Sequence, residues 1–489
     1  MPVRAWMHDV TFLLPPSLDE LVGPDHPVRF VAQVVEQIGP GLLAEWGVTP
    51  GGTIEGKPSY HVLMLLNVWL YGFMTGVRST RKLETACREQ IPYLWLTGHQ
   101  RPDHNTLWRF YKTRRASLRV LFKKTVRVAV EAGLVDLAVQ AVDGTKMAGN
   151  ASKDRTFSRK GLDRLAERTA AAIADLEAQN ETGGDDSPPR LPPGLTEWVQ
   201  REQAVKAALL RLDADTDLNQ VNLTDGDAVL MKGRGGFVAG YNAQAMVASL
   251  ALDRTDVTGR FLTAEAVTTD VDDHAQLIAL LDLAIANTGQ PVPSVLADGG
   301  YHSGAVVVGC EERGQVVIMP ESSTKKGEPP RPYHQDAFCY DQKTDAYTCP
   351  QGQILPFASL KHHKRGVTRV YHGNPAVCRA CPVFGSCTTD TRHGRMLQIG
   401  PENDALVKHR GWMATEWAKA LSRRRKVLPE PVFGIIKEQR GFRRFLLRGF
   451  HAVEAEWSLI TTGFNLRTLA KVWRFDRAAN KPSFVGLFH

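Results

Sequence analysis

Three acidic residues in this chain lie in surroundings that suit metal-dependent phosphate chemistry. Asp143 and Asp298 each end a short apolar run, where a carboxylate would lie at the tip of a buried strand. Glu430 is enclosed by arginines and lysines instead. Magnesium and manganese prefer carboxylate oxygens, and two such ions can promote in-line attack on a phosphodiester. Convergence of the three carboxylates would therefore indicate an enzyme that cuts or rearranges DNA.

Each acid also has a purely structural interpretation. An Asp-Gly pair after an apolar run most often forms a turn, and we expect such a turn at Asp143–Gly144. A single acid among bases often serves only as an ion-pair partner, which is the corresponding interpretation of Glu430. Glu438 competes with Glu430 for the third position.

The chain around Glu430 is strongly basic. Residues 419–448 hold ten basic residues against two acidic ones, a density greater than solubility requires. Together with the formal net charge of +8, this segment favours a polyanionic partner. We predict DNA-phosphate contacts from these bases and from one lysine beside Asp143, namely Lys437, Arg440, Arg443, Arg444, Arg423, Arg424 and Lys146.

Residues 1–135 have the pattern of a helical region. Apolar residues recur at helical spacing over 62–73, and Ser79 and Asp103 are suitable N-caps. Asp103 precedes a basic stretch that includes Arg109 and Arg115. A capped turn followed by a basic helix is typical of a helix-turn-helix DNA-binding module. The alternative is a solvated helix face.

The middle of the chain alternates between strand and helix patterns. The stretch 137–149 is predicted to be a strand with a turn at Asp143–Gly144. Further strands are predicted over 236–250, 260–269, 292–300 and 314–321, and a helix over 275–289. A helix–loop–helix insertion over 158–212 interrupts them, with a proline-rich loop at 180–194. This order predicts a mixed α/β sheet.

Four of the seven cysteines have the spacing of a metal site. The pattern C-x28-C-x2-C-x5-C predicts a tetrahedral structural zinc site formed by Cys349, Cys378, Cys381 and Cys387. The competing candidates for the fourth ligand are Cys339, His362, His363 and His372. Reduced thiols without metal are the alternative. Cys87 and Cys310 lie in apolar contexts and are expected in the core.

Four motifs together resemble bacterial insertion-sequence transposases of the DDE class, which have an RNase H-like catalytic core. They are VDGTKMAGNAS, LTDGDAVLMKGRGGFVAGYNAQAMV, LADGGYHSG and PEPVFGIIKEQRGFRRFLLRGF. In related transposases a lysine follows the catalytic glutamate by seven residues, as Lys437 follows Glu430. The tyrosine that usually precedes that glutamate is missing, and the stretch Arg423 to Lys426 stands in its place.

The resemblance implies a site and an activity. Asp143, Asp298 and Glu430 would be the catalytic triad and would hold two Mg²⁺ (or Mn²⁺) ions. The enzyme would bind the terminal inverted repeats of its element, cleave the ends and join the 3′-hydroxyl to target DNA. Double-stranded DNA would be its partner, and pairing of two ends implies a homo-oligomer. The other interpretations are a non-enzymatic DNA-binding protein derived from a transposase, and a nuclease that only cuts.

The expected fold class is α/β, an RNase H-like mixed sheet with helical and zinc-binding insertions, preceded by an all-helical N-terminal domain. The expected division is a helical DNA-binding domain over 1–135, a catalytic domain over 136–475 with insertions at 150–225 and 330–400, and a tail over 476–489. The N-terminus lacks a signal-peptide pattern, and the most apolar run, HVLMLLNVWLYGFMTG, is shorter than the ~20 residues that span a bilayer. We therefore expect a cytoplasmic, nucleoid-associated protein without membrane contact.

Overall fold

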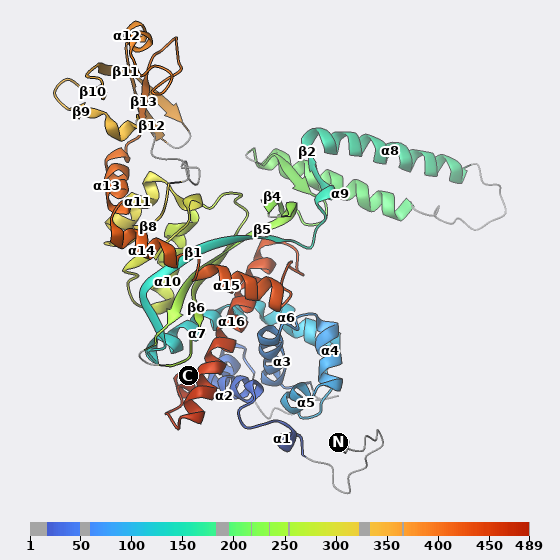
Figure 1. The fold of residues 1–489 in the computed structure, drawn as a ribbon. Coiled ribbons are helices and arrows are strands. Elements are labelled where there is room, and N and C mark those ends of the chain that lie inside the picture. Colours follow the sequence, from blue (N-terminus) through green and yellow to red (C-terminus); the bar gives the residue numbers. More distant parts are fainter. Residues whose placement is uncertain are drawn as a thin grey trace, which may run out of the picture.

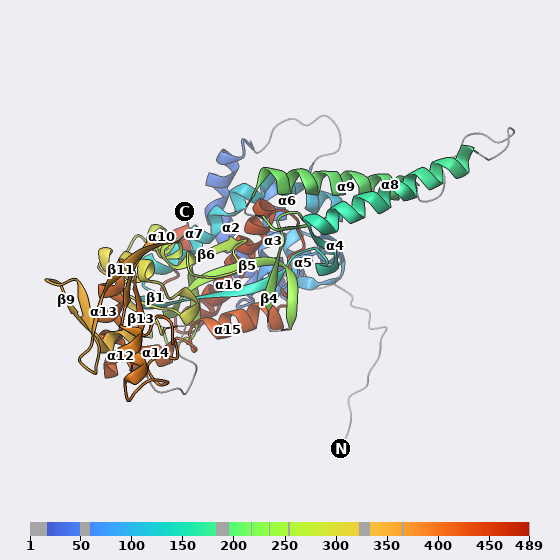
Figure 2. The same cartoon turned by 90° about the horizontal axis from the view of Figure 1, so that it is seen from above.

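The computed structural model describes residues 17–48, 59–181, 195–216, 218–233, 235–252, 255–321, 333–363 and 366–488. A body of helices and one large sheet carries two projections, a helical hairpin and a small sheet (Figure 1). Viewed from above, the hairpin extends far from the body (Figure 2). The body is the part that positions the candidate site.

Every described element before residue 132 is a helix, as predicted. These are α1 (Leu18–Leu21), α2 (Pro27–Glu45), α3 (Val62–Thr75), α4 (Thr80–Glu89), α5 (Ile91–Thr97), α6 (His104–Leu118) and α7 (Val120–Glu131). Asp103 caps α6 by accepting the Thr106 N–H at 2.8 Å. Ser79 occupies the N-cap position of α4, but its side chain makes no capping hydrogen bond. The predicted basic helix is two helices, because α6 ends before Arg119.

The body contains a mixed sheet whose longest strands lie at its centre. Its main strands run in the spatial order β6-β5-β1-β7-β8, and β4 pairs with the first part of β5. The strands are β1 (Val135–Ala148), β4 (Val229–Gly233), β5 (Gly236–Leu250), β6 (Arg260–Thr268), β7 (Ser294–Leu296) and β8 (Val316–Ile318). β1 is antiparallel to β5 and parallel to β7, so the sheet is mixed as predicted. The predicted strands and the helix α10 (Gln276–Thr288) are present, and Gly289 ends α10 in the left-handed conformation.

The turn predicted at Asp143–Gly144 is wrong. Both residues lie within β1, where Asp143 pairs with Ala245 and Gly144 with Gln244 of β5. The cross-strand ladder supplies the hydrogen bonds that a turn would otherwise satisfy. Asp143 is therefore inside a strand, whereas Asp298 does follow the end of β7, as expected.

One long helix joins the N-terminal helices to the sheet. α16 (Phe450–Ala478) buries most of its residues, including Trp457 and Trp473, and packs against α2, α3, α7 and β6. Its apolar residues, those of the N-terminal helices and those of β5 and β6 form a single hydrophobic core. Phe484, Val485 and Phe488 near the C-terminus are buried in the same core. Because burial is shared in this way, the N-terminal helices and the sheet support each other.

The helical hairpin consists of α8 (Arg159–Glu181) and α9 (Leu195–Ala214). The short strands β2 (Thr156–Ser158) and β3 (Gln220–Asn222) pair at its base, where Leu162, Val205 and Val221 are buried. The predicted pair of helices is confirmed. Residues 182–194, which include most of the predicted loop, lie outside the described residues.

The second projection is the cysteine-rich segment. Five strands lie in the order β13-β12-β11-β10-β9, with one short helix, and they enclose a separate small core that includes Tyr347, Leu355 and Tyr371. The elements are β9 (Cys339–Asp341), β10 (Ala346–Thr348), β11 (Ile354–His363), β12 (Gly366–His372), α12 (Pro375–Ala380) and β13 (Met396–Ile399).

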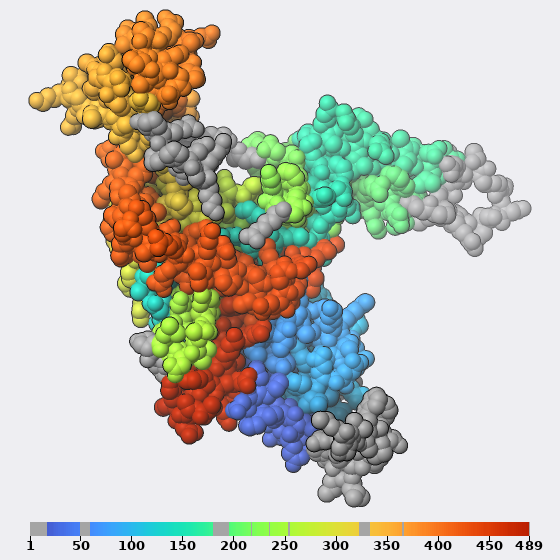
Figure 3. All heavy atoms as spheres, in the orientation of Figure 1, coloured from blue at the N-terminus to red at the C-terminus, as the bar shows by residue number. Residues whose placement is uncertain are grey.

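Short helices carry the chain from this projection back across the body. They are α13 (Asn403–Met413), α14 (Glu416–Arg424) and α15 (Pro429–Gly434), and a π-helical turn over Ile435–Gln439 follows α15. In the space-filling view these orange-red residues cross the front of the body between the two projections (Figure 3). The basic segment predicted from the sequence thus includes α14, α15 and the π-helical turn.

Within the described ranges, no single helix has both the length and the apolar character needed to span a membrane. Only α3 and α4 counted as one segment pass that test, and they meet at a bend of 102°.

Candidate active site

The sheet brings Asp143 and Asp298 close to each other. In the parallel pair β1–β7, Ala141 is opposite Leu296. Asp143 lies two residues further along β1, and Asp298 follows the end of β7 by two residues. The carboxylates are close enough for the charge of Asp298 to raise the pKa of Asp143. Each carboxylate accepts one local backbone N–H at 2.8 Å, Asp143 from Gly144 and Asp298 from Gly300.

Burial and like charge make Asp143 difficult to ionise. Its pKa is raised from 3.8 to about 6, first because the carboxyl is buried and second because Asp298 repels a negative charge there. Asp273 adds to this repulsion, whereas the Gly144 N–H and the positive charge of Arg425 oppose it. A buried carboxyl group whose pKa is raised in this way is typical of a functional site.

Asp273 is a member of the site that the sequence reasoning missed. It lies in the loop between β6 and α10, and its Oδ1 accepts hydrogen bonds from Asn242 Nδ2 and Gln244 Nε2, both at 2.6 Å, and from Lys146 Nζ at 3.2 Å. Its Oδ2 is on the side of Gly300 and therefore of Asp298. The acid-rich run TTDVDDH after a predicted strand was the available signal.

Buried amides hold this third carboxylate in place. Asn242 and Gln244 are fully buried on β5, and Gln244 Oε1 accepts the hydroxyl hydrogen of buried Tyr301. Gly144 makes room for them, because a Cβ there would be only 2.3 Å from Gln244 Nε2. These polar residues therefore position Asp273.

Lys437 and Arg425 bring positive charge to the same strand. Lys437 Nζ donates to Thr145 Oγ1 and, at 3.0 Å, to the carbonyl oxygen of Lys146, two and three residues after Asp143. Arg425 is near enough to lower the pKa of Asp143. Of these two, only Lys437 was among the predicted site residues.

The two rival glutamates lie in different settings. Glu430 is exposed on α15, a helix that packs on β1 and β5 through Val432 and Phe433. Its side chain makes neither a hydrogen bond nor an ion pair with any residue that the structure describes. The ion-pair interpretation of Glu430 therefore does not describe this structure. Glu438 does form an exposed ion pair, with Arg443.

The carboxylates lie near one another, but they are not close enough to coordinate one metal ion together. In the described parts of the chain, no group of three or more histidine, cysteine, aspartate or glutamate side chains is arranged to hold a metal ion. The structure thus brings Asp143, Asp298 and Asp273 close enough for their charges to interact, and Glu430 is not among the largest influences on the pKa of Asp143.

The arginines and lysines predicted to contact DNA are divided between the protein surface and its interior. Arg423 and Arg424 are exposed in the last turn of α14, and Arg109 is exposed on α6. Arg440 is only 8% exposed. The remaining members are partly occupied or partly covered: Lys146 contacts Asp273, Arg443 pairs with Glu438, Arg444 contacts Asn150, and Arg115 is half-buried.

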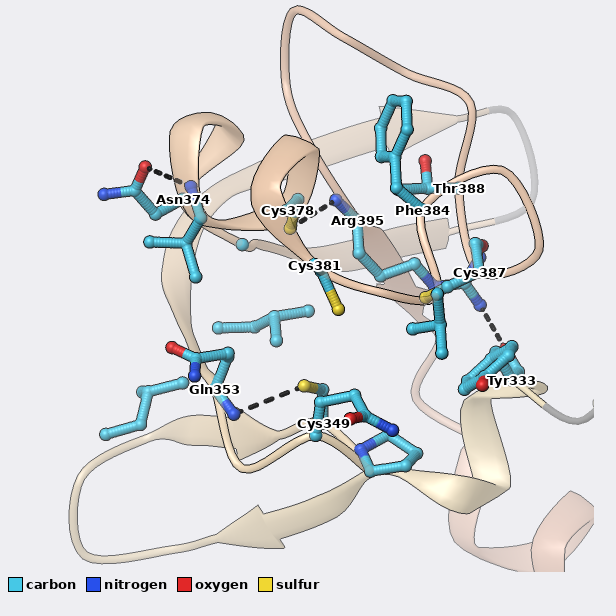
Figure 4. Close-up of a pocket in the computed structure, with 17 residues that line it drawn as sticks. Tyr333, Cys349, Gln353, Asn374, Cys378, Cys381, Phe384, Cys387, Thr388 and Arg395 are labelled. Carbon is cyan, nitrogen blue, oxygen red and sulfur yellow. Dashed lines mark hydrogen bonds between the residues drawn. The ribbon is translucent and has the colours of Figure 1, made fainter.

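The four predicted zinc-binding thiols line one small cavity of about 50 Å³. Figure 4 shows Cys349, Cys378, Cys381 and Cys387 around this space. Backbone N–H groups already point at two sulfurs, from Gln353 to Cys349 Sγ at 3.3 Å and from Arg395 to Cys378 Sγ at 3.4 Å.

The competing fourth ligands do not line this cavity. Cys339 is exposed on β9, and His362, His363 and His372 are elsewhere on β11 and β12. Burial raises the pKa of Cys387, and the charges that the other three thiols would carry raise it further. Cys87 and Cys310 are buried in the core, as predicted.

Two families of known proteins match this chain. A transposase DDE domain matches residues 348–470, and a transposase domain (DUF772) matches residues 16–113. The chain is similar to DDE-class insertion-sequence transposases. The first match contains Glu430 and Lys437, and the second covers most of the N-terminal helices of this transposase-like chain. A search of curated proteins and of solved structures found no match.

The family matches indicate the class of fold and the class of activity. The mixed α/β architecture with many helices fits a DDE transposase. The two matched domains indicate a DNA transposase. The DDE family works with divalent metal.

Proposed function

We propose that this chain is an active DNA transposase whose catalytic core is RNase H-like. The observation that carries the proposal is the proximity of Asp143, inside the central strand β1, to Asp298, just after the end of the neighbouring parallel strand β7. The order β6-β5-β1-β7-β8, with the Asp143 strand central, supports an RNase H-like core. The matched transposase DDE domain supports the activity.

The acidic cluster has the right chemistry for a divalent cation. Asp143 carries a carboxylate whose ionisation is opposed by burial and by Asp298, so a nearby cation would relieve both. Carboxylate oxygens are the hard ligands that Mg²⁺ or Mn²⁺ prefers. Asp143, Asp298 and Glu430 would hold two such ions. When bound, the ions supply a lowered pKa for the attacking hydroxyl and charge stabilisation for the phosphate.

The chain's own residues prepare the reaction in distinct ways. Asn242 and Gln244 fix the Asp273 carboxylate, which in turn holds Lys146 beside the site. Lys437 fastens the segment after α15 to β1, which brings the Glu430 helix over the strand that carries Asp143. Arg425 adds a positive charge that can bind a phosphate at the site. The combined effect is to orient a DNA phosphate against the carboxylates.

We also propose that the cysteine cavity holds a structural zinc ion. Four thiol ligands would leave no open position, so the ion would fasten the turn after β10 to α12 without taking part in catalysis. The N–H groups directed at Cys349 and Cys378 are the kind of outer contact that stabilises metal-bound sulfur. Zinc measured at about one atom per chain, and lost in Cys381→Ser, would support this site.

Recognition of the element ends is assigned to the N-terminal helices and the basic segment. Arg109, Arg115, Arg423 and Arg424 would contact DNA phosphates. Terminal inverted repeats, target joining, a homo-oligomeric synaptic complex and a cytoplasmic, nucleoid-associated location complete the proposal, together with the absence of membrane contact.

The decisive experiment incubates the full chain with a labelled element end, Mg²⁺ and a target plasmid. Joined product supports a transposase, cutting without joining indicates a nuclease, and binding alone indicates a DNA-binding regulator. Asp143→Ala and Asp298→Ala should abolish cleavage and leave DNA binding measurable.

The third carboxylate needs a matched pair of variants. Glu430→Gln should lose cleavage, because an unpaired exposed carboxylate over β1 is available to the site. Glu438→Gln removes the same charge from the neighbouring turn and only breaks an exposed ion pair with Arg443. Equal activity of both variants would remove Glu430 from the triad.

A further inference from the structure

A pocket far from the acidic cluster contains cations without acidic partners. It has a volume of about 400 Å³ and lies where α16 meets α2 and α3. In Figure 1, the red α16 and the dark blue α2 lie side by side in this part of the body. The residues that line it are His26, Pro27, Tyr71, Met74, Thr75, Arg467, Ala470, Lys471 and Arg474. None of them is an acid.

The three cations share one face of α16. Arg467, Lys471 and Arg474 are at spacings of four and three residues, which places their side chains along the same side of the helix. Among the described residues, none of the three side chains forms a hydrogen bond or an ion pair. Burial lowers the pKa of Lys471, and repulsion by Arg467 and Arg440 lowers it further.

A buried arginine lies behind this face. Arg440 is 8% exposed, and its Nε and Nη1 are buried without a hydrogen-bond partner in the described part of the chain. Its guanidinium is 5.3 Å from the ring centre of Phe464, one turn before Arg467. Burial, and then repulsion by Arg467, lowers its pKa from 12.5 to about 9. A buried charge without a partner is unfavourable, so a bound anion near Arg440 would stabilise the folded protein.

Two other polar groups of the pocket, His26 and Tyr71, can donate hydrogen bonds. His26 caps α2 by accepting the Val28 N–H on Nδ1 at 3.2 Å, so in the neutral ring Nε2 carries the hydrogen. The Tyr71 hydroxyl forms no hydrogen bond with the described residues. The pocket therefore offers hydrogen-bond donors and cations, and its lining includes no carboxylate. Such a lining matches a ligand that has negative charge and only acceptor oxygens, as a phosphate group does.

We propose that this pocket binds a phosphate group and that its source is the backbone of a DNA strand. The choice of DNA rests on the proposed transposase function, whereas the phosphate chemistry does not. Along α16, Lys471 is 14 residues from Trp457, whose Nε1 donates to the backbone of Gln244 at the candidate active site. At 1.5 Å per residue this is about 21 Å. The pocket would thus anchor DNA about 21 Å along α16 from the residue that contacts the active-site strand β5.

The first test uses inorganic pyrophosphate and the full chain. At constant ionic strength, pyrophosphate should raise the melting temperature of the natural protein. The double variant Arg467→Gln/Lys471→Gln should lose that rise. The control Arg477→Gln removes a cation from the same helix outside the pocket, where it pairs with Asp25, and should keep the rise. An equal rise in all three proteins, or no rise in any, would overturn the proposal.

The second test distinguishes DNA from a free polyphosphate. The double variant should bind a duplex oligonucleotide about tenfold more weakly at 0.1 M salt, with a slope of log affinity against log salt that is smaller by about 1 to 2. If pyrophosphate binding is lost while the salt slope stays unchanged, the DNA source is overturned and a free polyphosphate replaces it. Neither test requires DNA cleavage, so failure of the transposase assay and failure of this proposal are separate results.

Arg440 provides an independent check. Arg440→Met removes the buried charge, so the melting temperature in anion-free buffer should rise while the response to pyrophosphate falls. An arginine with only a packing role would give a lower melting temperature and an unchanged pyrophosphate response. If Arg440→Met does not fold, the double variant Arg467→Gln/Lys471→Gln still tests whether the pocket binds phosphate.

Discussion

Replacing Asp143 with asparagine should stabilise the protein while abolishing its activity. The pKa of Asp143 is raised from 3.8 to about 6 by burial and by Asp298. At about 1.4 kcal/mol per pKa unit, the ionised carboxylate destabilises the folded chain by about 3 kcal/mol at neutral pH. Asparagine carries no charge, and its Oδ1 can still accept the Gly144 N–H.

The pH dependence identifies the cause. Above about pH 6, Asp143 is ionised in both the folded and unfolded chains, so the folded state bears the whole destabilisation. As the pH falls from 6 to 4, the folded state takes up the proton first and the destabilisation disappears. The advantage of Asp143→Asn should therefore be complete at pH 7.5 and absent near pH 4.

The assay is thermal unfolding in chelator. An unfolding entropy of about 2.1 cal/mol/K per residue, taken over 489 residues, converts 3 kcal/mol into a melting temperature higher by about 3 °C at pH 7.5. The exposed Asp256→Asn serves as a charge-matched control and should change little. Mg²⁺ should then raise the melting temperature of the natural protein but not of Asp143→Asn. A variant that melts at or below the natural protein at pH 7.5, or that keeps its gain at pH 4, would refute the reasoning.

Three further predictions follow from individual contacts. Gly144→Ala puts a Cβ 2.3 Å from Gln244 Nε2, so the amide should lose Asp273, with a loss of about 1–3 kcal/mol in denaturant unfolding and a loss of DNA cleavage. Glu456→Gln breaks a buried ion pair with Arg78 and should cost about 3–5 kcal/mol in the same measurement, whereas a change below about 1 kcal/mol would show that the pair is dispensable. Cys378→Ser should lose bound zinc by elemental analysis, and full retention of zinc would contradict a four-thiol site.

Local patterns predicted the elements more reliably than the contacts between them. The helices of the N-terminal region, the strand pair β5–β6 and the glycine-ended α10 each carry a periodicity or a cap in their own residues. The Asp-Gly pair at 143–144 has equally strong turn character. It forms a strand because β5 pairs with β1 continuously from Ala141 to Ala148, and no local pattern encodes that partner.

The residues of the candidate site likewise divide into those that the sequence predicts and those that only the structure reveals. Asp298 follows an apolar run, and the Glu430–Lys437 spacing is visible in the sequence. Asp273 was missed because its importance comes from the buried amides of Asn242 and Gln244, more than 25 residues earlier. The fourth thiol was also undecided until the turn at Cys349 and the helix at Cys378 came together around one cavity.

The sequence by itself determined which residues could do chemistry, because residue type sets pKa, charge and metal preference. It also determined most elements, because periodicity and capping act over a few residues. Only the tertiary structure decided which carboxylates lie close enough to repel one another. Within the described residues, it also decided that the Arg440 guanidinium is buried with two unpaired nitrogens and that Glu438, unlike Glu430, forms an ion pair. Those properties depend on burial and on distances between segments far apart in the chain, and both exist only once α16 and the sheet have packed together.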